Sequence, residues 1–196
     1  MANGTECPVD VEDTAVNAGD RIDELHKRAK MEELVVLVWG PGDPGPKGPK
    51  EIKKYWAKRN QIRDLLAKEF PQSEVYFSEA LALRDHTRGL ESLLTEELVH
   101  AAIADCILVL DVSRGAHVEV DRFSNYPSIA HKIRVLLPEK YVGGTGLASQ
   151  VHQGLKVIGF SEIEFKQCSL ASVKAIKVVL SVAIEKLMTS RGFPQF

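Results

Sequence analysis

The sequence predicts an α/β fold: a five-stranded parallel sheet in the flavodoxin-like (Rossmann-like) order 2-1-3-4-5, forming the middle layer of a three-layer sandwich. Two observations predict this fold. Short apolar runs without polar alternation are typical of strands that are buried on both faces of a parallel sheet. Segments with helical hydrophobic spacing separate these runs, and the strand–helix unit recurs about five times. Such repetition requires right-handed crossovers between parallel strands.

Five short apolar runs are interpreted as the strands. The first, at residues 34–39, contains no charged residue and is expected at the centre of the sheet. The third, Cys106–Leu110, is equally apolar and is followed by Asp111. The remaining strands are expected at residues 75–77, 133–137 and 155–160.

Apolar residues at helical spacing predict the helices that connect these strands. Pro49 lies at the start of one of them, where a missing N–H is tolerated, and Pro71 ends the same helix. Ser169 is the expected N-cap of the last helix. The expected helices are residues 18–33, 49–70, 90–104, about 116–124, and 169–188.

The loop at residues 40–49 contains four glycines and four prolines, which exclude regular structure. It lacks the Gly-Lys-Ser/Thr ending of a Walker loop. It is therefore either a semi-rigid connector or a lid from which Lys47 or Lys50 contacts a phosphate. A second glycine-rich stretch, residues 143–146, resembles a phosphate cradle only weakly and is interpreted as a loop.

Length and composition favour one globular domain. Residues 1–17 are mostly small, polar and acidic, so we expect a flexible N-terminal segment there. Residues 18–196 are then expected to form a single α/β domain. The acidic N-terminus does not match a secretory signal.

Charge and hydropathy exclude several classes of partner. The net charge of −2 provides no broad basic surface, so we expect no nucleic-acid partner. The longest apolar run, residues 34–39, is too short to cross a bilayer, so we expect no membrane partner. Three cysteines lie far apart, without a CxxC pair, which argues against a disulfide framework and favours a cytoplasmic protein.

We expect neither a metal nor a cofactor. The six histidines show no HxxxH or HxH spacing. A Ser–His–Asp triad lacks a GxSxG elbow to support it. Cys106 lies within a strand and is interpreted as a core residue.

The candidate site lies where the first three strands end, because ligands of open α/β sheets bind at the carboxyl ends of the strands. The three catalytic candidates are carboxylates: Glu119, Asp111 and Glu79. The candidate substrate-binding residues lie beside them: Trp39, Gly40, Ser78, Ser113, Arg114, Gly115 and His117. Arg59 and Arg63, one turn apart on a helix, either reach a ligand or form a solvated face.

These residue types suit cleavage of an N-glycosidic bond. The departing base leaves an oxocarbenium-like sugar, which a carboxylate such as Glu119 can trap covalently or stabilise electrostatically. Asp111 or Glu79 could orient a hydroxyl or protonate the base, while Ser113 and nearby amides hold a phosphate or ribose hydroxyl. The alternative is that Glu119 only interacts favourably with the helix dipole.

The strand at Ala104 to Leu110, followed by Ser113-Arg114-Gly115-Ala116 and Glu119, resembles nucleotide-processing α/β domains of the nucleoside 2-deoxyribosyltransferase-like, TIR-like and SLOG-like group. The resemblance covers residues 34–188 in architecture and 104–123 in motif. It implies that Glu119 cleaves a base–sugar bond and that Ser113 and Gly115 face the nucleotide. The sequence departs from the deoxyribosyltransferase pattern in its Pro-rich first loop and in the lack of an Asp-Gly run after Asp111.

Three functions therefore stay open. The first is a hydrolase or transferase that cleaves the N-glycosidic bond of a nucleotide, either NAD or a nucleoside monophosphate, in a bacterial anti-phage or nucleotide-signalling system. The second is a non-catalytic nucleotide-signal sensor of the SLOG or TIR type. The third is an interaction scaffold that uses the helix at residues 18–33. In the first two, the ligand is a nucleotide or NAD, and a homo-oligomer is expected.

Overall fold

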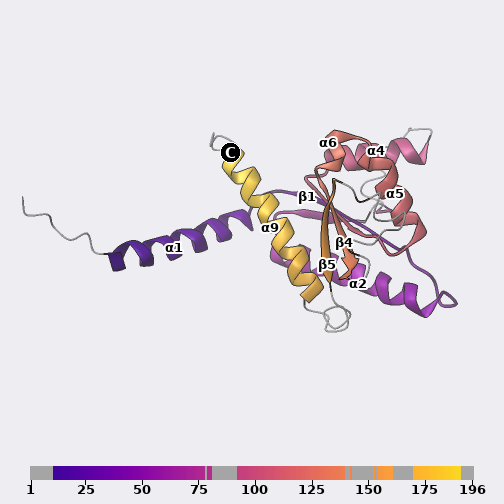
Figure 1. Ribbon diagram of the computed structural model, residues 1–196, viewed down its shortest axis with the longest axis horizontal. Helices are drawn as coiled ribbons and strands as arrows, with labels where there is room; N and C mark the ends of the chain where they lie inside the picture. The colour runs from indigo at the N-terminus through magenta and orange to yellow at the C-terminus, as the bar shows by residue number, and fades with distance from the viewer. Residues whose placement is uncertain are drawn as a thin grey trace, which may run out of the picture.

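Five parallel strands form one sheet in the order β2-β1-β3-β4-β5 in the computed structural model (Figure 1). The structure describes residues 11–77, 79–80, 92–139, 142, 152, 154–160 and 170–190. The parallel sheet and its flavodoxin-like order confirm the fold class predicted from the sequence. The strands are β1 (Val35–Trp39), β2 (Glu74–Tyr76), β3 (Cys106–Leu110), β4 (Ile133–Pro138) and β5 (Lys156–Phe160).

The register aligns the carboxyl ends of the neighbouring strands. Trp39, the last residue of β1, pairs with Val109 of β3, and Leu110 of β3 pairs with Leu136 of β4. All pairings are parallel, so the residues that follow β1, β2 and β3 emerge at one edge of the sheet. This carboxyl edge is where the candidate residues were expected.

Helices cover both faces of the sheet (Figure 1). Helices α2 and α9 pack on one face, and α4, α5 and α6 lie on the other. Side chains alternate along β1 accordingly: Val36 and Val38 contribute to the first core, and Leu37 and Trp39 to the second. This alternation explains why the strand has no polar positions. The helices are α1 (Val11–Ala29), α2 (Lys50–Glu69), α4 (Leu93–Ile103), α5 (Arg114–Ser124), α6 (Pro127–Ala130) and α9 (Leu170–Ser190).

The starts of α1, α4 and α5 differ from the sequence prediction, and α4 begins at Leu93 instead of residue 90. Helix α1 begins at Val11, ahead of the expected start at residue 18, so it includes part of the segment expected to be flexible. It extends away from the sheet and meets α9 at its C-terminal end (Figure 1). Helix α5 begins at Arg114 because Ser113 caps it, and the short helix α6 was not predicted. The expected N-cap Ser169 lies outside the described residues.

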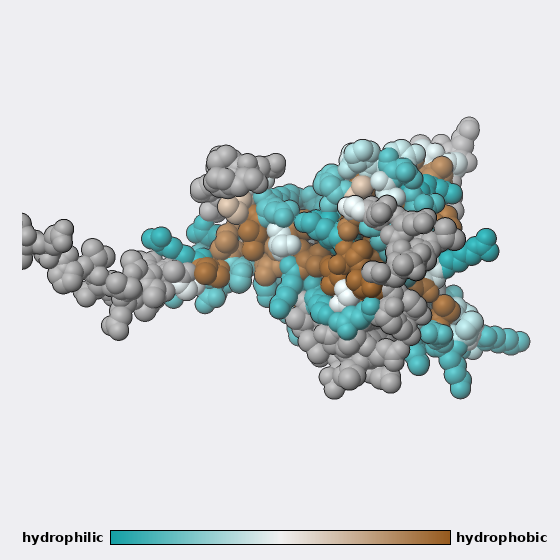
Figure 2. All heavy atoms as spheres, viewed as in Figure 1, coloured by the Kyte–Doolittle hydropathy of each residue, from teal (hydrophilic) through white to brown (hydrophobic). Residues whose placement is uncertain are grey.

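Apolar residues gather over α9 and the adjoining edge of the sheet on the face shown in Figure 2. Ile176, Leu180 and Ile184 of α9 are only partly buried there, packed against the core of that face. Among the helices that the structure describes, none is long and apolar enough to span a bilayer.

Candidate functional site

Arg59 joins the carboxyl ends of β1 and β2. Its side chain is 1% exposed, although it comes from helix α2. Its Nε donates to the carbonyl of Val38 at 2.9 Å, and its Nη1 donates to the carbonyl of Pro41 at 3.3 Å. The guanidinium also lies 4.1 Å from the centre of the Phe77 ring. Arg59 is therefore a buried structural cation at the site, and not part of a solvated face.

Glu79 is the charge partner of Arg59. Its two carboxylate oxygens accept hydrogen bonds from Nη1 and Nη2 at 2.6 and 2.7 Å. The Glu79 side chain is 47% exposed on its other side. A carboxylate that accepts a bidentate Arg bond is held in one orientation. This arrangement suits Glu79 to hold the Arg59 guanidinium in place at the site.

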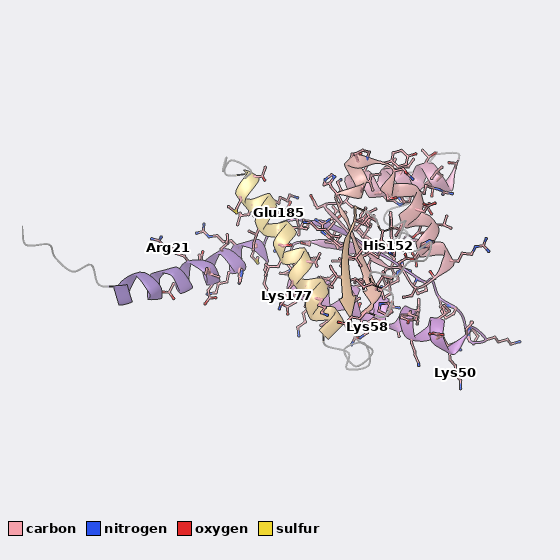
Figure 3. The ribbon with its side chains drawn as sticks, in the orientation of Figure 1. Arg21, Lys50, Lys58, His152, Lys177 and Glu185 are labelled. Atoms are coloured by element: carbon pink, nitrogen blue, oxygen red, sulfur yellow. The ribbon has the colours of Figure 1, made fainter. Side chains whose placement is uncertain are left out.

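Asp111, the first residue after β3, is in hydrogen-bond contact with two histidines. Its Oδ2 lies 3.0 Å from Nδ1 of His117 and 2.6 Å from Nε2 of His152. Each ring nitrogen either donates to the carboxylate or keeps its lone pair, depending on which tautomer the histidine adopts. The Asp111 and His152 side chains are 3% and 6% exposed, whereas His117 is 32% exposed. His152 comes from the chain before β5 and lies beside the sheet on the α5 side (Figure 3).

Glu119 lies in the second turn of α5, half-buried, on the same carboxyl side of β3. Burial and the nearby Glu97 carboxylate raise its pKa from 4.5 to about 7, while Arg59 and Arg122 act in the opposite direction. Among the described residues, no hydrogen bond engages the Glu119 carboxyl. Glu119 therefore differs from Asp111, whose carboxylate already has its partners.

Ser113 caps helix α5. Its Oγ accepts from the backbone N–H of Ala116 at 3.3 Å, and its carbonyl accepts from the N–H of His117 at 3.0 Å. The next two residues, Arg114 and Gly115, are exposed, and no atom lies within 4 Å of a Cβ built on Gly115. The Ser-x-Gly part of the motif is thus explained by the start of helix α5, which Ser113 caps.

Trp39 and Gly40 lie at the carboxyl end of β1. Trp39 is 1% exposed and packs against Phe123, with ring centroids 5.1 Å apart. Its Nε1 is buried without a hydrogen-bond partner among the described residues. A Cβ on Gly40 would lie 3.2 Å from Cβ of Leu110 and 3.3 Å from Cδ of Arg59. Gly40 therefore permits the close packing of β1, β3 and α2 at this edge.

The structure brings most of the predicted site residues to one edge. Ser78 lies outside the described residues, and the Trp39 ring is buried in the core instead of facing a ligand. Lys47 and Lys50 of the loop at residues 40–49 are exposed. Burial raises the pKa of the Cys106 thiol to about 12, in keeping with its place in the core.

Sequence reasoning missed two residues of this edge. Arg59 was considered without a partner, and His152 was not a candidate at all. The position of Arg59 on the apolar side of α2, between Tyr55 and Ile62, was the available signal. His152 has no such signal, because 41 residues separate it from Asp111.

Comparisons with known proteins add little to this geometry. No protein-family model matches the sequence, and no curated protein matches it. Among solved structures, a two-domain esterase active on acetylated mannans, co-crystallised with mannopentaose, matches at 12% identity and a TM-score of 0.37. The match covers 84% of this chain and 54% of the esterase chain, so this chain spans about half the length of that protein. At this TM-score, the likeness carries no argument about function.

Proposed function

We propose that this protein cleaves the N-glycosidic bond of a nucleotide, either NAD or a nucleoside monophosphate, with Glu119 acting on the sugar. One observation carries the proposal: Glu119 is a half-buried carboxyl at the carboxyl edge of the sheet with no hydrogen bond to any described residue. Its neighbours Glu79 and Asp111 are both held by other side chains. A carboxyl in this position that accepts no hydrogen bond from the described part of the chain is available to a bound ligand.

The proposed chemistry assigns distinct roles to the three carboxyl groups. As the bond between C1′ and the base breaks, the base leaves with the electron pair and the sugar gains positive charge. Glu119 stabilises that charge or bonds to C1′, and water or an acceptor hydroxyl then completes the substitution. Glu79 and Asp111 position the surrounding cationic and imidazole groups. The resemblance of the motif to nucleotide-processing domains supports the same role for Glu119.

The experiment is a survey of substrates with two variants. Purified protein is incubated with NAD, nucleosides, and ribo- and deoxyribonucleotides, and free base is separated by chromatography. Glu119→Gln keeps the size of the side chain but removes its charge. Asp121→Asn removes a carboxylate from the exposed surface of the same helix and serves as the matched control.

Base release by the wild type and by Asp121→Asn, with a loss of about 100-fold or more in Glu119→Gln, would support the proposal. Base release that Glu119→Gln retains would overturn the assignment of Glu119. Binding without turnover, measured as a rise in melting temperature, would indicate the sensor function instead. A homo-oligomer, a cytoplasmic location and a role in anti-phage defence stay predictions.

A further inference from the structure

Asp111, His117 and His152 form a cluster whose ligating atoms all lie within 4.8 Å of one another. They come from three separate places: the end of β3, the first turns of α5, and the chain before β5. Their positions in the sequence show no metal-binding spacing, so the sequence predicted no metal. The fold creates the cluster by bringing the turn after β3 next to the segment before β5.

The chemistry of the cluster is that of a transition-metal site. Two imidazoles and one carboxylate are the donors that zinc and other divalent transition metals prefer. The carboxylate is 3% exposed, and with neutral histidines the cluster carries a formal charge of −1. A divalent cation between the three groups would directly offset that buried negative charge and bring the cluster to a formal charge of +1.

The geometry requires only small movements to admit an ion. Ligands at about 2.1 Å around a tetrahedral zinc ion lie about 3.4 Å apart. The carboxylate oxygen already lies 3.0 and 2.6 Å from the two ring nitrogens. Each imidazole can remain neutral by placing its proton on the other ring nitrogen. His117 is the most exposed of the three, at 32%, and leaves a side of the cluster toward which a fourth ligand can approach.

We propose that Asp111, His117 and His152 bind one divalent transition-metal ion of the zinc class. The proposal does not depend on the proposed function, because binding is measured without any substrate. The alternative is a metal-free network in which both histidines donate hydrogen bonds to Asp111. The two alternatives differ in whether the folded protein takes up one ion through these side chains.

The test uses the full chain without an affinity tag, stripped of metal with a chelator. Zn²⁺ binding is measured by titration calorimetry, and Co²⁺ binding by the visible absorption of the coordinated ion. His117→Gln and His152→Gln each remove one ligand. His131→Gln is the matched control, because His131 is an exposed histidine whose Nδ1 lies near the carbonyl of Pro127 instead of Asp111.

One ion per chain in the wild type and in His131→Gln is expected. Affinity should fall by about tenfold or more in His117→Gln and His152→Gln. The ion should also raise the melting temperature of the wild type. Absence of saturable binding to the wild type would overturn the proposal. So would binding by His117→Gln and His152→Gln that is as tight as binding by the wild type. Circular dichroism confirms that each variant is folded, and the partly exposed His117→Gln decides the result where the buried His152→Gln does not fold.

Discussion

Arg59 of α2 and Glu79 after β2 form a bidentate ion pair, with N–O distances of 2.6 and 2.7 Å. The pair connects a helix to the ends of two strands, since the same guanidinium also binds the backbone carbonyl of Val38 in β1 and that of Pro41 after it. Arg59 is 1% exposed, so its charge depends on these acceptors in place of water. The pair therefore fixes the carboxyl edge on which the candidate site is built.

Removal of the Glu79 charge should destabilise the fold. In Glu79→Gln, the amide nitrogen would face one N–H donor of Arg59, and that donor would lose its acceptor. We expect a loss of about 1–3 kcal/mol in the free energy of unfolding, measured by urea denaturation. Glu69→Gln, which breaks the more exposed pair with Lys30, is the control and should cost less than about 1 kcal/mol. Equal losses in the two variants would contradict the role of the Arg59 pair.

Gly40 should be intolerant of a side chain. An added methyl group would approach Leu110 and Arg59 at 3.2 and 3.3 Å, which is closer than ordinary contact. We expect Gly40→Ala to lower the free energy of unfolding by about 1–3 kcal/mol. Gly42→Ala, in the same loop, meets no atom within 4 Å and should change stability by no more than about 0.5 kcal/mol. A neutral Gly40→Ala variant would show that this edge can relax.

The sheet could be predicted because its central strands are recognisable in the sequence as short apolar runs. β1 and β3 are buried on both faces, so each consists of consecutive apolar residues, and the strand order follows from the crossover rules. The start of α1 could not be placed, because residues 1–17 are mostly small, polar and acidic, a composition that is typical of a flexible segment. Helix α6 is too short to produce a periodic pattern.

The candidate site was predictable only in part. Asp111, Ser113 and Glu119 follow one strand directly, so their common location is a local consequence of the fold. The Arg59 pair and the His152 contact join segments 20 and 41 residues apart, and no local pattern encodes such pairs. Buried charges also resemble surface charges in a sequence, which is why Arg59 was ambiguous.

Ser113 provides a test of the helix cap at the start of α5. Ser113→Ala removes the oxygen that accepts from the Ala116 N–H, so we expect a loss of about 1 kcal/mol in stability. Ser113→Asp restores a capping oxygen and should recover most of that stability. Urea denaturation of the two variants measures the difference. If alanine is neutral, the hydroxyl does not stabilise the helix start.

Glu119 should make stability depend on pH. Its pKa is 4.5 in the unfolded chain and about 7 in the fold, so folding favours the protonated form. The stabilising contribution is complete below pH 4.5 and is lost as the pH rises through about 7. Because Glu119 is half-buried, we expect Glu119→Gln to be more stable than the wild type by about 1–3 kcal/mol at pH 8, but not at pH 4.5.

The measurement is urea denaturation of wild type and Glu119→Gln at both pH values, in buffer with EDTA so that no metal ion contributes. Asp121→Asn controls for the loss of one negative charge from α5, since Asp121 is exposed on the same helix. A Glu119→Gln advantage that is equal at the two pH values would show that burial of the charge is not its cause. An advantage confined to the higher pH would establish that the fold retains a destabilising carboxylate at this edge, as is expected for a group kept for ligand chemistry.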